Sequence, residues 1–337
     1  MAVAILSCGG ASTTESSRRV NLYGWVNYFP PDMLRQFTKD TGIQVELDTY
    51  ASNEELMEKL MAGVTDYDVI NPSDYILAAM IGSNLLQPLD HSQLPNLTNA
   101  AERFRNSQFD KDSRYSVPFL WSFAGIGYDK TKVQEPVDSW GILWNPKYKD
   151  RILMLDDPMD CFAVALKWMG YSVNTQNREQ LIAARDALLR QKPLVKVYNS
   201  TNFDEILAAG DVWLAHGWNG DFAKIIARYP NLAFAVPKEG SAMSVDYLAM
   251  PRNAPHKREA HTFINYCLSA KVAASVTNFN GYPTTNEAAT PFIRLELIRN
   301  PAVFPDSEIT KTFEIVVTPS GETAQLRDRL WTEVKSR

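Results

Sequence analysis

The sequence predicts an α/β protein built from parallel, doubly wound sheets in two domains. Three observations support this prediction. Strand-like and helix-like segments alternate along the chain, aromatic and acidic residues follow the strand ends, and 337 residues exceed what one hydrophobic core usually organises. Hydrophobic residues make up 45% of the chain and charged residues 22%, which is typical of a globular protein rather than a disordered one.

The first quarter of the chain carries clear boundary signals. Pro30 and Pro31 suit the first turn of a helix, and Gly42 suits its end. Ser52 and Glu55 have the spacing of a capping box. The expected elements are a strand at 20–26, a helix at 31–40, a strand at 44–50, a helix at 54–61, a strand at 67–71 and a helix at 74–81. This order predicts a parallel sheet.

A second alternating set follows a long extended stretch at 115–128, which we expect to cross between the domains. Its elements are a strand at 151–155, helices at 159–170 and 177–190, a strand at 195–198, a helix at 202–209 and a strand at 212–215. Residues 246–250 are again extended and predict a second crossing, and helices resume from about residue 256.

Aromatic and acidic residues gather at the predicted strand ends and crossings. In parallel sheets, ligands bind beyond the carboxyl ends of the strands. Aromatic faces attract ammonium groups and carboxylates accept charged hydrogen bonds, so this set suits an elongated organic cation. An acidic residue after a strand can also simply cap a helix. The residues are Trp25, Tyr28, Tyr50, Ser73, Tyr75, Asp157, Asp160, Trp218, Asp221, Asp246 and Tyr282.

The composition argues against several other functions. A net charge of −5 does not suit nucleic acid, whose partners usually carry a concentrated basic face. The three cysteines and four histidines show no metal-ligand spacing, and the sequence offers no cofactor motif and no nucleophile–base pair. We therefore expect no enzyme activity, no metal and no cofactor. An enzyme that uses Asp156, Asp157 and Asp160 as acid and base remains the alternative from another class.

The amino terminus resembles the end of a bacterial lipoprotein signal. A short apolar run ends in Leu6, Ser7 and Cys8, and a polar stretch follows up to Arg19. We expect Cys8 to carry lipid and residues 1–19 to comprise a signal remnant and a tether. The apolar run is shorter than a complete signal core, which indicates a misplaced start codon. A chance cysteine in a cytosolic chain is the alternative.

From about Val20 to its end, the chain resembles the bacterial spermidine/putrescine-binding proteins, a branch of the periplasmic binding proteins. Several independent segments carry this resemblance in the expected order: 22–31, 37–42, 49–54, 67–75, 115–118, 145–149, 155–157, 218–221, 237–240 and 281–284. The resemblance implies a two-lobed, type II-like periplasmic binding fold joined by a hinge. The implied lobes are residues 20–122 with 246–291, and 123–245 with 292–337.

The resemblance also implies roles for single residues. It makes Trp25 and Trp218 opposite aromatic walls, and it gives the first lobe's side of the cleft Tyr28, Ser73 and Tyr75. Further implied ligand contacts are the acidic pair Asp157 and Asp160, the carboxylate Asp246 at the crossing, the aromatic Tyr282, and Asp221, an acidic position of putrescine-selective members. Departures from the family pattern are Asn27 in place of an acid, Ser244 in place of a bulky aromatic, and Val316 in place of a polar contact.

The expected function is capture of putrescine or spermidine between the lobes, followed by delivery to an ABC importer. The implied partners are the polyamine ligand and the permease and ATPase subunits, with membrane attachment only through the lipid. The protein is expected to be a periplasmic, membrane-anchored monomer that binds no nucleic acid. The same fold binding another small organic cation is a further alternative.

Overall fold

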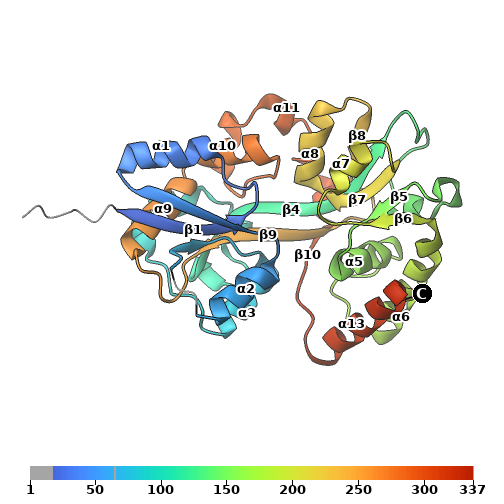
Figure 1. Ribbon diagram of the computed structural model, residues 1–337, viewed down its shortest axis with the longest axis horizontal. Helices are drawn as coiled ribbons and strands as arrows, with labels where there is room; N and C mark the ends of the chain where they lie inside the picture. Colours follow the sequence, from blue (N-terminus) through green and yellow to red (C-terminus); the bar gives the residue numbers. More distant parts are fainter. Residues whose placement is uncertain (1–17, 64–65, 337) are drawn as a thin grey trace, which may run out of the picture.

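A computed structural model describes residues 18–63 and 66–336, which form two α/β halves side by side (Figure 1). The predicted lipid site, Cys8, lies outside the described residues. Within the described part of the chain, ten strands form one sheet. Eight of them follow the order β2-β1-β3-β9-β4-β7-β5-β6, while β10 pairs with β9 and β8 pairs with β4. The predicted α/β class and its two-lobed arrangement are confirmed.

The first half follows the predicted alternation closely. Its elements are β1 (Arg19–Trp25), α1 (Pro31–Thr41), β2 (Gln44–Tyr50), α2 (Asn53–Met61), β3 (Val69–Ile70) and α3 (Asp74–Gly82). Strand β1 pairs in parallel with β2 on one side and β3 on the other. The register aligns Trp25 with Tyr50, so the carboxyl ends of both strands reach the same edge of the sheet.

Local chain signals explain the helix boundaries in this half. Gly42 has a φ of 70°, the left-handed conformation that ends α1. Ser52 Oγ accepts the amide of Glu55 at 3.2 Å, as the capping box predicts. The Glu55 carboxylate reaches back to the amide of Ala51 rather than to that of Ser52. Both contacts satisfy amides at the start of α2.

Two antiparallel strands run from one half of the molecule into the other. These are β4 (Ser116–Asp129) and β9 (Ala242–Ala249), which lie side by side in the centre of Figure 1. The predicted crossings at 115–128 and 246–250 are therefore confirmed, although β9 starts four residues earlier than predicted. It does so because Met243 and Ser244 pair with β4, while Ala242 and Met243 pair with the distant strand β10 (Glu314–Ile315).

The second half repeats the alternation of strands and helices. Its elements are β5 (Ile152–Met154), α5 (Pro158–Trp168), α6 (Arg178–Gln191), β6 (Val195–Tyr198), α7 (Phe203–Ala208), β7 (Leu214–Trp218), α8 (Asn219–Arg228) and β8 (Leu232–Ala235). The predicted strand at 212–215 was placed too early. Antiparallel pairing of residues 214–218 with β4 extends β7 to Trp218, which is therefore its last residue.

The remaining helices cover the two halves. They are α4 (Glu102–Arg105), α9 (Lys257–Cys267), α10 (Ala270–Asn280), α11 (Leu295–Ile298), α12 (Ser307–Thr310) and α13 (Gly321–Ser336). Short 3₁₀ helices lie between them: η1 (His91–Gln93), η2 (Pro95–Asn99), η3 (Lys111–Ser113), η4 (Trp140–Trp144), η5 (Pro146–Tyr148), η6 (Lys192–Leu194) and η7 (Glu287–Phe292). No helix among the described residues is both long and apolar enough to cross a membrane.

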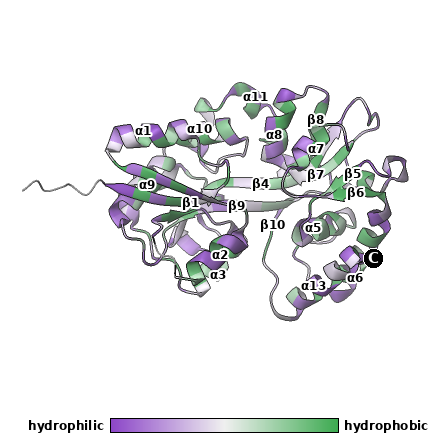
Figure 2. Ribbon diagram, in the orientation of Figure 1, coloured by the Kyte–Doolittle hydropathy of each residue, from purple (hydrophilic) through white to green (hydrophobic). Residues whose placement is uncertain are grey.

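Two hydrophobic clusters each lie within one half, and a third joins buried residues of both halves, among them Tyr23, Leu153 and Phe313. The cluster of the first half joins side chains from Val20 to Leu120 with side chains from Leu248 to Tyr282. The cluster of the second half joins side chains from Ala124 to Leu214 with Leu330 and Val334 of α13. Strand β4 contributes side chains to all three clusters, and helix α5, which Figure 2 colours mostly as hydrophobic, contributes to the cluster of the second half. Burial of these faces stabilises the halves by about 25 cal/mol for each Å² of apolar surface removed from water.

Candidate ligand-binding cleft

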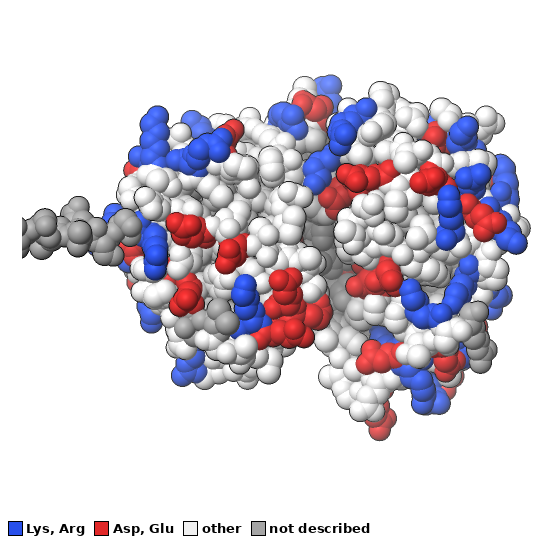
Figure 3. Space-filling view, in the orientation of Figure 1, with Lys and Arg blue, Asp and Glu red and all other residues white. Residues whose placement is uncertain are grey.

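A groove separates the two halves on the face seen in Figure 3, and acidic side chains gather on both of its sides. The candidate site is described from the first half, across the aromatic side chains, to the second half. Its residues come from strand ends, helix starts and the crossing strand β9, as expected for a sheet that presents ligands at its carboxyl edge.

Asp246 lies in the crossing strand β9 and is only 5% exposed. One carboxylate oxygen accepts a hydrogen bond from Ser73 Oγ at 2.6 Å, and the other accepts one from the hydroxyl of Tyr28. Ser73 precedes α3, and Tyr28 follows β1 after a turn in which Asn27 has a φ of 59°. Three segments that are distant in sequence therefore meet at this carboxylate.

Burial raises the pKa of Asp246 to about 6, because an ionised carboxylate loses its hydration there. Hydrogen bonds from Ser73 and Tyr28 favour the charged form and oppose this effect. The Trp25 indole also lowers the pKa, although its buried Nε1 has no hydrogen-bond partner among the described residues. No salt bridge to Asp246 forms in the described part of the chain, so this carboxylate is available to a cation.

Asp74 is a second buried carboxylate near this site, and sequence reasoning missed it. It accepts hydrogen bonds from Ser244 Oγ at 2.8 Å and from the Val245 amide at 3.0 Å. Burial raises its pKa to about 7, and the nearby charge of Asp246 adds to the rise. Ser244, expected to leave space in the cleft, thus also ties β9 to the start of α3.

Aromatic rings line the first half of the cleft. Trp25 packs on Tyr50 with ring centroids 4.7 Å apart, and Tyr28 packs on Tyr282 at 5.5 Å. The Tyr75 hydroxyl accepts a hydrogen bond from Asn53 Nδ2 at 2.8 Å. Such rings offer faces to ammonium groups and to methylene chains. The structure therefore brings Trp25, Tyr28, Ser73, Tyr75, Asp246 and Tyr282 into one region.

The acidic pair of the second half lies at the start of α5. Asp157 caps this helix by accepting the amide of Asp160 at 2.9 Å, so the capping role considered from the sequence is present. Asp160 accepts a hydrogen bond from Trp218 Nε1 at 3.1 Å. Burial raises the pKa of both carboxyl groups, and the charge of Asp157 raises that of Asp160 further. Neither forms a salt bridge among residues 18–63 and 66–336.

Asp156 belongs to a different environment from its two acidic neighbours. Its carboxylate is paired with Lys335 Nζ of α13 at 2.7 Å, and it is solvent-exposed. Asp157, in contrast, lies near Tyr75 of the other half: burial is the main cause of the raised pKa of Tyr75, and the charge of Asp157 adds to the rise. The pair formed by Asp157 and Asp160 therefore faces the cleft, while Asp156 does not belong to it.

Asp221 lies in the first turn of α8 and links the two halves. Its Oδ2 accepts the Tyr282 hydroxyl at 2.7 Å, and its Oδ1 forms a salt bridge of 3.1 Å with Lys224. Asp221 and Lys224 line a cavity of about 300 Å³ together with Asn27. The residues lining this cavity are Asn27, Thr201, Asn202, Asp204, Glu205, Asp221, Lys224, Ile225 and Arg228.

Glycines allow the close contact between Tyr282 and α8. A Cβ atom on Gly220 would lie 2.4 Å from the Tyr282 ring, and one on Gly281 would lie 2.7 Å from the carbonyl oxygen of Gly220. Gly281 also has a φ of 78°, which favours glycine. These positions let the end of α10 approach the start of α8 across the interface between the halves.

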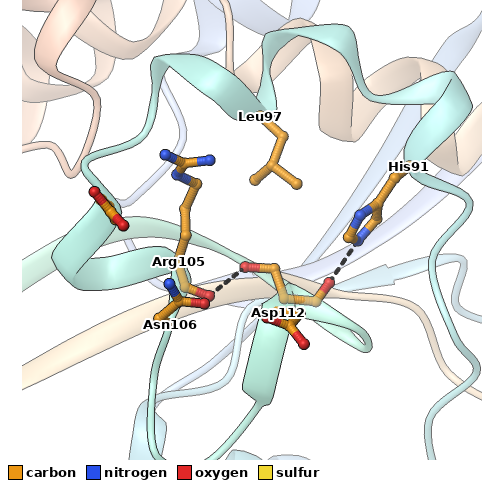
Figure 4. A pocket seen from close by; sticks show the side chains of 7 residues that line it. His91, Leu97, Arg105, Asn106 and Asp112 are labelled. Atoms are coloured by element: carbon orange, nitrogen blue, oxygen red, sulfur yellow. Dashed lines mark hydrogen bonds between the residues drawn. The ribbon is translucent and has the colours of Figure 1, made fainter.

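A second cavity of about 300 Å³ holds none of the predicted site residues. Figure 4 shows the side chains of His91, Leu97, Arg105, Asn106 and Asp112 around it. His91 Nε2 lies 2.8 Å from the carbonyl oxygen of Ser113. All of these residues belong to the first half of the sequence and lie apart from the acidic pair of α5. Among the described residues, no cluster of histidine, cysteine and acidic side chains could hold a metal ion.

Comparison with known proteins agrees with this two-lobed architecture and its interlobe groove. The sequence profile of the family described as bacterial extracellular solute-binding protein matches residues 32–305. The chain belongs to this family. Its fold class and its recognition as a solute-binding protein are therefore confirmed.

Similar members of the family carry names that refer to polyamines. The putrescine-binding periplasmic protein PotF of Escherichia coli K12 is 32% identical, and the match covers 100% of this chain and 96% of that protein. The spermidine/putrescine-binding periplasmic protein of the same organism is 36% identical, with 93% and 91% covered. Both names describe periplasmic proteins that bind polyamines.

Solved structures show the same fold. The spermidine/putrescine ABC transporter substrate-binding protein PotD of Streptococcus pneumoniae is 30% identical, with a TM-score of 0.89. That match covers 95% of this chain and 99% of the pneumococcal one. The Tp0655 lipoprotein of Treponema pallidum is 27% identical, with a TM-score of 0.87, and covers 95% and 100%.

Proposed function

We propose that this protein captures a polyamine between its lobes. Carboxylates without a basic partner, one buried and two partly buried, carry the proposal. Asp246, Asp157 and Asp160 lie on the two sides of the groove beside aromatic rings, and none forms a salt bridge in the described part of the chain. Charged groups that are buried need partners, and a ligand ammonium would supply them. The names of the similar proteins support a polyamine over another organic cation.

In this proposal, Asp246 grips one ammonium group while Ser73 and Tyr28 hold its carboxylate in place. Asp157 and Asp160 receive the charge at the other lobe. The rings of Trp25 and Trp218 enclose the methylene chain, with contributions from Tyr75 and Tyr282. Each desolvated contact between an ammonium group and a ring contributes on the order of 0.5 to 2 kcal/mol. Asn27 and Asp221 complete the proposed set of ligand contacts.

The proposed lobes are residues 20–122 with 246–291, and 123–245 with 292–337. Two of the hydrophobic clusters support this division, because one draws on residues 20–120 and 248–282 and the other on residues 124–214 and 330–334; a third cluster contains residues of both lobes. Ligand contacts from both lobes are complete only when the lobes close. A polyamine therefore favours the closed state, which we propose docks as a monomer on the permease and ATPase of an importer.

Titration calorimetry tests the proposed ligand. We expect putrescine and spermidine to bind with dissociation constants of about 1 μM or tighter, equivalent to about −8 kcal/mol. Glucose and glutamate serve as unrelated solutes and are expected to give no heat. We expect putrescine to bind at least as well as spermidine, because Asp221 supplies an acid at the proposed diamine site. Absence of binding to either amine, by folded protein, contradicts the proposal.

We further propose that Cys8 carries a lipid that anchors the protein at the periplasmic side of the cell membrane. The short apolar run before Cys8 supports this, and a similar structure belongs to a protein named as a lipoprotein. Mass spectrometry of protein expressed in a bacterium tests it. Lipid on the cysteine and loss of membrane attachment in Cys8→Ser are expected, whereas an unmodified Cys8 in membrane-derived protein contradicts the proposal.

A further inference from the structure

Asp221 differs from the other cleft carboxylates because it already has a cationic partner. Lys224 Nζ lies 3.1 Å from Asp221 Oδ1, and the Tyr282 hydroxyl occupies Oδ2. Both oxygens of this carboxylate are therefore engaged within the protein. Asp246, Asp157 and Asp160 have hydrogen-bond donors, yet none forms a salt bridge among the described residues.

We propose that Lys224 sets ligand specificity by acting as a built-in competitor for the ammonium site at Asp221. This inference rests on the proposed function. Lys224 follows Asp221 by three residues on α8, so its side chain lies on the same helix face and needs no ligand to reach the carboxylate. A ligand ammonium must displace Lys224 to gain the full charge of Asp221.

Exposure makes this displacement feasible. The Lys224 side chain is 37% exposed and that of Asp221 is 27% exposed, and both line the cavity of about 300 Å³ beside Asn27. A partly exposed pair of this kind is stable by about 0.2 to 1 kcal/mol, so a bound ammonium can replace it. The displaced lysine can then turn toward Asp204 or Glu205, which line the same cavity.

The competition affects ligands according to the ammonium groups they carry. A monoamine has one ammonium group, which goes to a carboxylate without a salt bridge, such as Asp246. A putrescine or spermidine molecule carries a second ammonium group that binds elsewhere in the cleft. If this group binds at Asp221, it must compete with Lys224 for the carboxylate. Lys224 therefore penalises the diamine and the triamine, and leaves the monoamine nearly unaffected.

Calorimetry with putrescine, spermidine and n-butylamine on four variants tests this proposal. Lys224→Met keeps the apolar stem and removes the charge. We expect it to tighten putrescine or spermidine binding by about 1.4- to fivefold, the range set by a partly exposed ion pair. Arg228→Met is the matched control, because Arg228 lines the same cavity and lies on the same helix. It reports the general effect of removing one positive charge.

A double-mutant cycle separates local competition from general electrostatics. In an Asp221→Asn background, Lys224→Met is expected to change affinity no more than Arg228→Met does. Equal effects of the two methionine variants in the wild-type background, or weaker polyamine binding in Lys224→Met, overturn the proposal. Failure of the wild type to bind any polyamine instead refutes the proposed function, so the two failures are distinguishable.

Discussion

At the residue scale, two opposing effects set the pKa of the Asp246 carboxylate. Burial favours its neutral form, and hydrogen bonds from Ser73 and Tyr28 favour its charged form. The balance leaves its pKa at about 6, well above that of an exposed aspartate. A cation in the cleft would shift the balance toward the charged form, which links ligand binding to the protonation of this residue.

Replacing Asp246 with asparagine tests its proposed role in gripping the ligand. We expect Asp246→Asn to weaken putrescine binding by about 2 to 4 kcal/mol, because a buried ammonium loses its charge partner. Calorimetry provides the measurement. Asp186→Asn, on the outer side of α6, is the matched control for loss of one negative charge. An unchanged affinity in folded Asp246→Asn protein would remove this residue from the site.

The raised pKa of Asp246 predicts how binding depends on pH. The amines stay charged from pH 5 to 8, since aliphatic ammonium groups titrate near pH 10. Above about pH 6 the carboxylate is ionised and ready to bind; below it, the ligand must first displace a proton. We expect affinity to fall by up to about tenfold for each pH unit below 6. Asp160, whose pKa burial raises to about 8, adds a decrease that begins near pH 8.

Calorimetry of the same titration at several pH values checks this expectation. Asp157 and Asp160 also have raised pKa values, so Asp246→Asn should reduce the pH dependence without removing it. An affinity that stays level from pH 5 to pH 8 would show that the cleft carboxylates do not change protonation when ligand binds.

At the element scale, hydrogen bonds connect the start of α3 to the crossing strand β9. Asp74 accepts hydrogen bonds from Ser244 and from the Val245 amide, while the neighbouring Ser73 binds Asp246 of the same strand. Buried hydrogen bonds of this kind fix the position of a helix relative to a sheet, because each lost partner leaves a buried polar group unsatisfied. The proposed ligand contacts of α3 and β9 are thus held in one rigid unit.

Asp74 makes the stability of the ligand-free protein depend on pH in an unusual direction. Its folded pKa of about 7 exceeds the ordinary value of 3.8, so folding favours the protonated form. The stabilisation is complete below pH 3.8 and is lost as pH rises through about 7. This contribution alone lowers the free energy of unfolding by on the order of a few kcal/mol across that range.

Thermal unfolding without polyamine tests this effect. Acid denaturation of other groups affects wild type and variant alike, so the comparison is the difference in Tm between wild type and Asp74→Asn from pH 5 to 8. We expect the wild type to lose stability relative to Asp74→Asn as pH rises. A difference that is constant over this range would show that Asp74 keeps one protonation state.

The sequence predicted those elements whose signals are local. The strand at 44–50 has the predicted bounds, and Gly42 and Ser52 marked helix ends correctly. Elements that depend on distant pairing were missed or misplaced. Strand β10 pairs with residues about 70 positions earlier in the sequence. The strand β7 was predicted too early because its last residues are held in the sheet by pairing with β4, which is distant in sequence. Periodicity within a short segment carries no information about such partners.

The candidate site shows the same division. Residue types at strand ends and crossings predict Trp25, Trp218 and Asp246 as members of one site, and this remains a prediction. The structure places Trp25 near Asp246 and Trp218 against Asp160. The burial of Asp74 depends on the approach of Ser244 from 170 residues away, which no local pattern shows. Lys224 was visible in the sequence, since a lysine three residues after an acid on a helix is a common ion-pair spacing.

At the scale of the whole molecule, the two crossing strands lie side by side. Strands β4 and β9 pair at Ser122 with Ser244 and at Phe123 with Met243. Strand β10 pairs with Ala242 and Met243 of β9 beside this place. Adjacent crossings let one half rotate against the other by twisting a few residues. The fold is therefore suited to opening and closing around a ligand.

Closure of the lobes predicts a change in overall dimensions. We expect small-angle X-ray scattering to show a smaller radius of gyration at saturating putrescine than without ligand, because contacts from both lobes are complete only in the closed state. Glucose is the control solute. Asp246→Asn should show the same decrease only at proportionally higher putrescine concentrations, since closure follows occupancy. The contradicting result is a radius of gyration that stays constant in samples that calorimetry shows to be saturated. It would mean that the two halves are already closed without ligand, held by contacts such as the hydrogen bond from Tyr282 to Asp221.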